Sequence, residues 1–391
     1  MAGSVGMPKG AADAINDMLD NVAKLQPGDS VLIVSELEDL YNKDWIVDET
    51  AVSWIQQAVM IKGGNASVLW IDEPPVAHKW RFNPVLKGAM MGCDVLINHS
   101  LNLVTEEHAE FRAFIHEHKI RMVRNFASTA PLLNSYWAQT PYELVSQIRY
   151  QSSLAFKDGV PFTLTDENGT HLEGNIVGGD ANRQDSATGV PGMPYSSWRH
   201  EAGYYLPWPE WVHPPVSIKN TSGIHIFDCM LSWWSRYIGI SPYFDDPIVI
   251  TVENNRMTKI EGKKEAEALK KFLADMETRV GTAVWDFPAF HHGVHPQAVI
   301  GEHQCPNINV RRTIEHSSCS NIHLHIGAPP STVDYPYWMH CTGDIRRPTL
   351  KVGDEYVMIK GHLTALDHPA VKAVAEKYPG RPGVEPMPVS F

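Results

Sequence analysis

Histidines gather in the last third of this 391-residue chain, in three segments that also hold carboxylates. The segments read AFHHGVHPQAVIGEHQ (289–304), EHSSCSNIHLHIG (315–327) and WMHCTGD (338–344). Neutral imidazole offers a lone pair at physiological pH and is the commonest side-chain ligand of metals. A single histidine is more often an ordinary core or surface residue. The grouping, rather than any one member, therefore predicts a site for a divalent metal.

Within the second segment, His323 and His325 stand two residues apart in a run typical of a β-strand. A strand has a period of two, so both side chains should lie on one face. Two imidazoles buried together need a metal or hydrogen-bonding partners. His291 and His292 are adjacent, so only one of them can face a common site. The simplest interpretation of the histidines at 303 and 316 is that they are solvated.

The N-terminal part of the chain alternates short apolar runs with amphipathic stretches. The runs at 30–35, 67–71 and 94–98 read as buried strands, and helical spacing appears at 50–62 and near 106–118. This pattern is typical of βα units around a mostly parallel sheet. No GxGxxG or GxxxxGK[ST] motif follows a strand, so a nucleotide site has no support. We expect an open α/β, Rossmann-like scaffold domain over residues 1–158.

The pattern changes at about residue 159, where two alternating runs flank Asn168-Gly169, a strong hairpin signal. A second hairpin is expected around Asn254-Asn255, followed by a charged helix at 263–276. The irregular stretch 175–215, rich in Gly, Pro, Trp and Tyr, is either a binding loop or a well-packed surface loop. We expect a β-rich α+β domain over residues 159–391 that holds the metal.

Composition and charge exclude several classes of function. The net charge is −12 and no dense basic run occurs, which argues against a nucleic-acid partner. The first residues lack a basic then apolar leader, and no stretch is long and apolar enough for a bilayer. The five cysteines are scattered without a CxxC pair, as expected for reduced thiols. We therefore expect a cytoplasmic protein with neither nucleic-acid nor membrane partners.

The segment 208–276 resembles the bacterial 2,5-dihydroxypyridine 5,6-dioxygenases and, more distantly, metallo-aminopeptidases of the aminopeptidase T type. The resemblance is carried by LPWPEWVHPP, by Gly223 before an apolar strand, by a hairpin, and by IEGKKEAEALKKFL. It extends to about Gly361 and covers the N-terminal α/β domain as well. It implies a metalloenzyme that forms a homodimer.

Matched residue by residue, the resemblance implies a set of metal ligands. Glu210 matches a metal-binding Glu of the aminopeptidases, His323 the ligand His of their HIALG segment, and His340 the His of an HxD pair. One further ligand position aligns near Ala289, with His291 and His292 the closest candidates, and we assign it to His291. Two imidazoles and a carboxylate suit Fe(II) with open positions, although Zn²⁺ or Mn²⁺ could also occupy such a site. The Asp of the HxD pair is replaced by Thr342, with Asp344 two residues later.

Two reactions are compatible with these residues. The first is cleavage of a small hydroxylated aromatic or heteroaromatic ring by a dioxygenase that uses Fe(II), with His325 as acid or base for a ring hydroxyl and Asp344 as the catalytic carboxylate. The second is hydrolysis by metal-activated water, with Glu210 or Glu302 as the base. A binding protein built on a decayed metalloenzyme fold is the non-enzymatic alternative.

Overall fold

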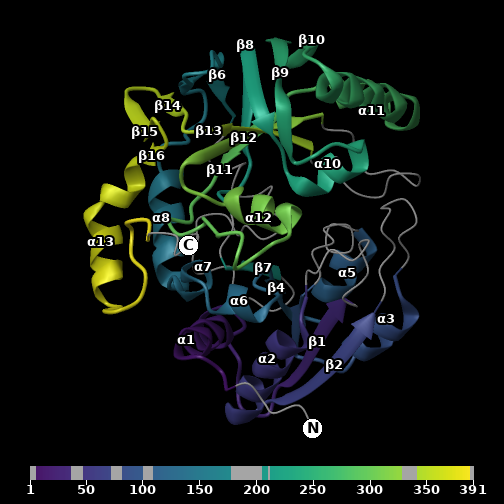
Figure 1. The fold of residues 1–391 in the computed structure, drawn as a ribbon, viewed down its shortest axis with the longest axis vertical. Helices are drawn as coiled ribbons and strands as arrows, with labels where there is room; N and C mark the ends of the chain where they lie inside the picture. Colours follow the sequence, from purple (N-terminus) through teal and green to yellow (C-terminus); the bar gives the residue numbers. More distant parts are fainter. Residues whose placement is uncertain are drawn as a thin grey trace.

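Two β-sheets organise the chain (Figure 1). The computed structural model describes residues 6–36, 47–71, 82–99, 109–177, 205–209, 212–327 and 341–387. One sheet has five strands in the order β2-β1-β3-β4-β7, and the other has eleven strands. The predicted combination of a parallel sheet with helices and a β-rich region is confirmed at this level.

The five-stranded sheet is parallel throughout. The strands at 30–36, 65–71 and 95–98 form where the sequence predicts short apolar runs, because such runs can be buried on both faces of a parallel sheet. Strand order reverses between β1 and β3, which lie side by side near its centre. The strands are β1 (Ser30–Glu36), β2 (Asn65–Ile71), β3 (Val95–Asn98), β4 (Arg121–Asn125) and β7 (Tyr205–Trp208).

Helices connect these strands and lead to the second sheet. The carboxylate of Asp48 accepts the backbone N–H of Ala51 at 2.6 Å, which caps the start of α2, and that of Ala130 at 2.7 Å. One side chain thereby joins two helices. The helices are α1 (Lys9–Asp17), the π-helical turn η1 (Met18–Val22), α2 (Glu49–Ile61), α3 (Pro84–Met90), α5 (Ala109–Glu117), α6 (Ala130–Leu133), α7 (Tyr136–Gln139) and α8 (Tyr142–Ser153).

The eleven-stranded sheet contains both predicted hairpins. The β5–β6 hairpin turns at Asn168-Gly169, and the β9–β10 hairpin turns at Asn254-Asn255, both in the left-handed region with φ of 49° and 63°. The strands are β5 (Pro161–Thr165), β6 (His171–Ile176), β8 (Val216–Cys229), β9 (Tyr243–Glu253), β10 (Arg256–Glu261), β11 (Ala289–His292), β12 (Asn321–Ile326), β13 (Cys341–Arg346), β14 (Thr349–Val352), β15 (Glu355–Ile359) and β16 (His362–Leu363).

The 14-residue strand β8 joins both ends of a three-stranded unit. Its first residue pairs with β11 (Phe290 with Val216), and its last pairs with β13 (Asp344 with Cys229). Because β12 lies between β11 and β13, the four strands close on themselves. This closure fixes which residues of β11, β12 and β13 share a face.

The remaining helices cover this second sheet, and the last of them packs beside α8 of the N-terminal part. Leu269 and Leu273 on the amphipathic α11 are buried, as the predicted helix requires. The last helix, α13, lies beside α8 (Figure 1), and Lys377 and Tyr378 just after it bond the carboxylate of Glu143 at 2.5 and 2.7 Å. These elements are α10 (Ser232–Ile238), α11 (Lys264–Val280), η4 (Thr282–Trp285), α12 (Ile308–Glu315), η5 (Thr364–Asp367) and α13 (Pro369–Glu376).

Strand β7 belongs to the parallel sheet although it lies beyond residue 158. The chain thus passes from the parallel sheet to β5 and β6 and then comes back before β8. The predicted domain boundary at 158 stays a prediction, and β7 crosses it. Among the described helices, none has the length and apolar character needed to cross a membrane.

Candidate metal centre

Three neighbouring strands carry a row of chemically active side chains on one face. His291 on β11 pairs with His323 on β12, which pairs with Asp344 on β13. His325 lies two residues from His323, so the period of two places it on the same face. His316, at the end of α12, packs onto this row. We call these five residues the histidine face.

On the opposite face of the same strands, the nearest row carries no polar side chain. It consists of Phe290, Leu324 and Gly343, each adjacent in sequence to a residue of the histidine face. A Cβ atom on Gly343 would lie 2.4 Å from Nε2 of His225 on β8, so only glycine fits this contact. The alternation of apolar and polar rows explains why the strands hold a fixed register.

Four imidazole rings on the histidine face form a column. Ring centroids are 4.5 Å apart for His325 and His291, 4.7 Å for His291 and His323, and 3.6 Å for His323 and His316. All but His325 are buried, and His325 is partly exposed. The expectation that His323 and His325 share a face with one member of the 291–292 pair is thus met.

Backbone carbonyls fix the rings on both sides of β11. Nδ1 of His291 donates to the carbonyl of His213 at 2.7 Å, so its Nε2 keeps the lone pair. His292 points to the other face and stacks on His213 at 4.7 Å, and burial lowers the pKa of His292 to about 4. Gly293 follows, where a Cβ atom would lie 1.9 Å from the carbonyl oxygen of Ser318. Only glycine allows β11 to approach the turn before β12 this closely.

Asp344 is held by three protein partners. Its Oδ2 accepts from Nδ1 of His316 at 2.6 Å and contacts Nη2 of Arg312, and its Oδ1 accepts from the hydroxyl of Thr342 at 2.8 Å. Burial acts to raise the pKa of Asp344, but the charges of His316 and Arg312 and these hydrogen bonds outweigh it, so the pKa lies below its ordinary value. The carboxylate is therefore ionised at neutral pH.

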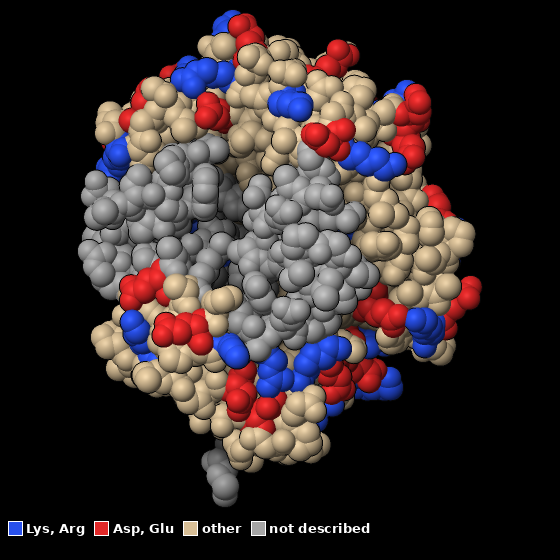
Figure 2. All heavy atoms as spheres, turned by 180° about the vertical axis from the view of Figure 1, so that it is seen from behind, with Lys and Arg blue, Asp and Glu red and all other residues tan. Residues whose placement is uncertain are grey.

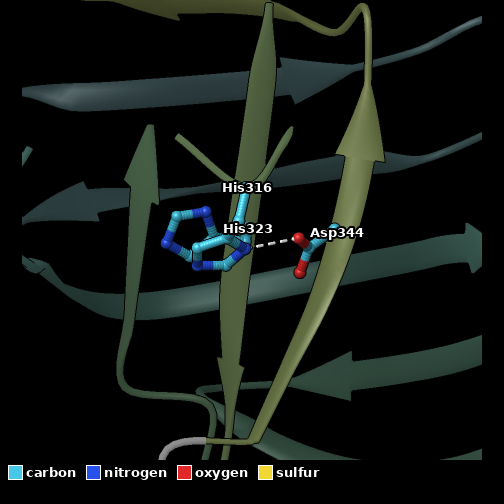
Figure 3. Close-up of side chains that lie close together, drawn as sticks. All are labelled: His316, His323 and Asp344. Carbon is cyan, nitrogen blue, oxygen red and sulfur yellow. Dashed lines mark hydrogen bonds and ion pairs between the residues drawn. The ribbon is translucent and has the colours of Figure 1, made fainter. Parts of the chain in front are cut away.

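His316, His323 and Asp344 offer ligand atoms that all lie within 4.8 Å of one another (Figure 3). Of the residues that the structure describes, they form the one group of this kind. The interpretation of His316 as solvated is wrong, because its side chain is 1% exposed. The spacing of four between Arg312 and His316 on a helix could have shown that both face the same way. His303 is exposed, as expected.

Two predicted ligands, Glu210 and His340, lie outside the described residues. His340 directly precedes β13, whose first residue Cys341 pairs with Ile326 of β12. The assignments of Glu210, His291, His323 and His340 to a metal, and of His325 and Asp344 to catalysis, stay predictions.

A second row of polar residues lies at the carboxyl ends of the parallel strands. The sequence did not predict it. Val34 pairs with Asn98 in the β1–β3 register, so one further residue places Ser35 opposite His99, and the β3–β4 register places Asn125 beside them. We call Ser35, His99 and Asn125 the switch-point row. All three are fully buried. In open α/β sheets, ligands bind at the carboxyl ends of strands where the order reverses.

Hydrogen bonding determines which donor atoms the switch-point row offers to a ligand. The amide of Asn125 donates to Nδ1 of His99 at 3.4 Å, so the ring carries its proton on Nε2. Burial lowers the pKa of His99 to about 3, which keeps the ring neutral. Neither His99 Nε2 nor the hydroxyl of Ser35 has a hydrogen-bond partner among the described residues. The row therefore presents an N–H and an O–H donor.

Comparison with known proteins gives a likeness in fold. No family model matches the chain, and no curated protein sequence matches it. Among solved structures, 2,5-dihydroxypyridine dioxygenase from Pseudomonas putida KT2440 is similar, with a TM-score of 0.59 and 12% identity over 90% of this chain and 96% of that one. The predicted resemblance to these dioxygenases is confirmed as a distant relationship of fold. The link to aminopeptidase T stays a prediction.

Proposed function

We propose that this protein is a non-heme Fe(II) dioxygenase that cleaves the ring of a small hydroxylated aromatic or heteroaromatic compound. The observation that carries the proposal is the stacking of His291, His323 and His325 on one face of two neighbouring strands, β11 and β12. The similarity in fold to a 2,5-dihydroxypyridine dioxygenase supports the same class of reaction. A site on a shared fold can change its chemistry, so the proposal depends on these side chains.

The donor atoms present fit a divalent transition metal. Nδ1 of His291 is fixed by a backbone carbonyl, the arrangement in which metal-binding imidazoles offer Nε2. His291 and His323 would hold the ion, together with the predicted ligands His340 and Glu210. Bound Fe(II) would supply the activation of dioxygen that a ring-cleaving reaction requires. Imidazole and carboxylate ligands also suit Zn²⁺ or Mn²⁺.

The side chains themselves would bind the substrate and move its protons. His325 is the partly exposed imidazole of the histidine face, and it would take or return the proton of a ring hydroxyl. The donors of His99 and Ser35 would bind an oxygen substituent of the ring. Figure 1 shows the arrowheads of β1 and β2 directed toward the half of the molecule that holds the second sheet.

The face shown in Figure 2 gives no sign of a large charged partner among its described residues. On the face shown in Figure 2, acidic and basic side chains are interspersed, and the described residues form no broad area of one sign. An even mixture of charges is what a protein that acts on a small molecule needs for solubility. We therefore propose a small aromatic compound as the substrate. We propose a homodimer as the assembly on a separate ground, the resemblance to the dioxygenase family.

Anaerobic purification, metal analysis and oxygen uptake test this proposal. We expect stoichiometric iron and consumption of O₂ when a dihydroxylated pyridine or benzene is supplied, with His303→Ala as an active control. Turnover of an amide substrate with bound zinc and no O₂ uptake would instead establish the hydrolase. A protein that retains no metal after reconstitution would be a binding protein.

A further inference from the structure

The C-terminal end of α12 places a fourth imidazole on the histidine face. The ring of His316 lies nearly parallel to that of His323, at 28°, with centroids 3.6 Å apart. None of the ligand positions implied by the resemblance falls on His316, which reaches the face from a helix rather than from a strand. Its burial and its contact with His323 call for a role in the site.

The partner of His316 fixes which ring nitrogen would bind an ion. Nδ1 lies 2.6 Å from Oδ2 of Asp344, and an ionised carboxylate can only accept a hydrogen bond. Nδ1 therefore carries a hydrogen, and Nε2 is the ring nitrogen that would bind an ion in place of any proton it holds. A histidine that donates Nδ1–H to a carboxylate while Nε2 binds the ion is the usual arrangement around protein metals.

Asp344 itself is poorly suited to bind the ion. Its two oxygens already accept from His316 and Thr342, and the buried guanidinium of Arg312 contacts it directly. A cation on this carboxylate would have to displace Arg312 or sit beside its charge. Asp344 is instead placed to orient the ring of His316.

The local fold holds both partners of Asp344 in position. Asn307 caps α12 by accepting the N–H groups of Asn309 and Val310 at 2.9 and 3.0 Å, so the helix starts at a fixed residue. Arg312 and His316 then lie one turn apart, and the N–H of His316 donates to the carbonyl of Arg312 at 3.0 Å. The spacing presents both side chains to the same carboxylate (Figure 3 shows the His316 contact).

We propose that His316 is a further ligand of the metal, through Nε2, and that Asp344 and Arg312 are positioning residues for its ring. The proposal rests on the metal site of the proposed function and adds a ligand that comes from α12. It also explains the buried Arg312–Asp344 pair. The two opposite charges balance each other, so the pair adds no net charge beside the ion while it orients the ring of His316.

Metal affinity measured on metal-free protein tests the inference without any assay of turnover. The apo protein is titrated with Co²⁺ or Zn²⁺ against a chromophoric chelator. We expect His316→Gln to weaken binding by about 100-fold and Asp344→Asn by about 10-fold, within the range for residues that orient a ligand. The Cu²⁺ form should show one fewer coordinated imidazole in His316→Gln by pulsed electron paramagnetic resonance.

Two controls separate ligand loss from damage to the fold. His292→Gln removes a buried imidazole from the opposite face of β11 and should bind metal like the wild type. Far-ultraviolet circular dichroism and melting report whether each variant is folded. If His316→Gln does not fold, the nearly isosteric Asp344→Asn decides, and wild-type affinity in that variant would overturn the inference.

The outcomes also distinguish this inference from the proposed function. If the wild type binds no metal, the metal site fails and the inference fails with it. If the wild type binds metal and His316→Gln binds equally tightly with the same number of imidazoles, the role of His316 is refuted while the proposed function stands.

Discussion

The histidine face and the switch-point row are built alike but differ in charge. Each is a set of register-matched residues across three adjacent strands, buried at the point where a sheet meets other elements. Asp344 of the histidine face forms an ion pair with Arg312, whereas the switch-point row contains only neutral groups. The pair of Arg312 and Asp344, which we call the charged anchor, holds the ring of His316 in one orientation, as a metal ion requires of its ligands. Neutral donors suit the oxygen atoms of an organic molecule.

The largest expected effect comes from breaking the charged anchor. Arg312→Leu leaves the carboxylate of Asp344 buried without its guanidinium, which should lower the free energy of unfolding by about 3–5 kcal/mol. Denaturant unfolding measures this. The control is Arg346→Leu, because Arg346 pairs with Asp228 at the surface and should cost under about 1 kcal/mol. Equal losses in the two variants would show that the buried pair is no anchor.

Removing a metal-binding ring from the histidine face should weaken metal binding strongly while the protein stays folded. We expect His323→Ala to lower affinity by about 100-fold, since loss of a ligand costs at least as much as loss of a residue that orients one. His340→Ala, predicted from sequence, should do the same. Metal content by elemental analysis checks both variants, with His303→Ala as the silent control. Full occupancy in His323→Ala would remove it from the ligand set.

Lowering the pH below about 4 should remove the contribution that Asp344 of the histidine face makes to stability. The pKa of Asp344 is lower in the folded protein, so its contribution to stability is present above the unfolded pKa of about 4 and is lost as the pH falls through the folded value. The stability difference between wild type and Asp344→Asn should therefore shrink below about pH 4. Unfolding curves at several pH values measure it. A difference independent of pH would contradict an ionised Asp344.

The smallest effect should come from the switch-point row. His99→Ala removes one donor and should raise KM by about 10-fold, the equivalent of one hydrogen bond of about 1.4 kcal/mol. Metal affinity should not change, because the row contains none of the proposed ligands. Steady-state kinetics and metal titration of the same preparation give both values. Loss of metal together with the rise in KM would show that His99 supports the metal site rather than the substrate alone.

The sequence predicted elements better than their pairing. Strands 30–35 and 94–98, the Asn168-Gly169 hairpin and the shared face of His323 and His325 all follow from local patterns of apolar residues and turns. The register that sets Asp344 opposite His323 could not be read, because long connections separate β11, β12 and β13 and no tight turn fixes their alignment.

Some site residues were missed because their signal depends on partners far along the chain. His316 has a helical spacing from Arg312, but only the position of β13 shows that a carboxylate meets both. The switch-point row has no motif, since its members come from three strands and carry common residue types. The segment that forms strand β7 lies in a stretch predicted to be irregular, yet it pairs with β4.

The close approach at Gly293 has an evolutionary consequence. Any side chain at this position would clash with the backbone of Ser318. Sequence divergence that changes most residues of β11 should therefore leave a glycine directly after the two histidines. Gly343 is constrained by the side chain of His225 rather than by backbone. Two glycines fixed by these close contacts, next to His292 and Asp344 in the sequence, would mark descendants of this site even where overall identity has fallen too low to recognise.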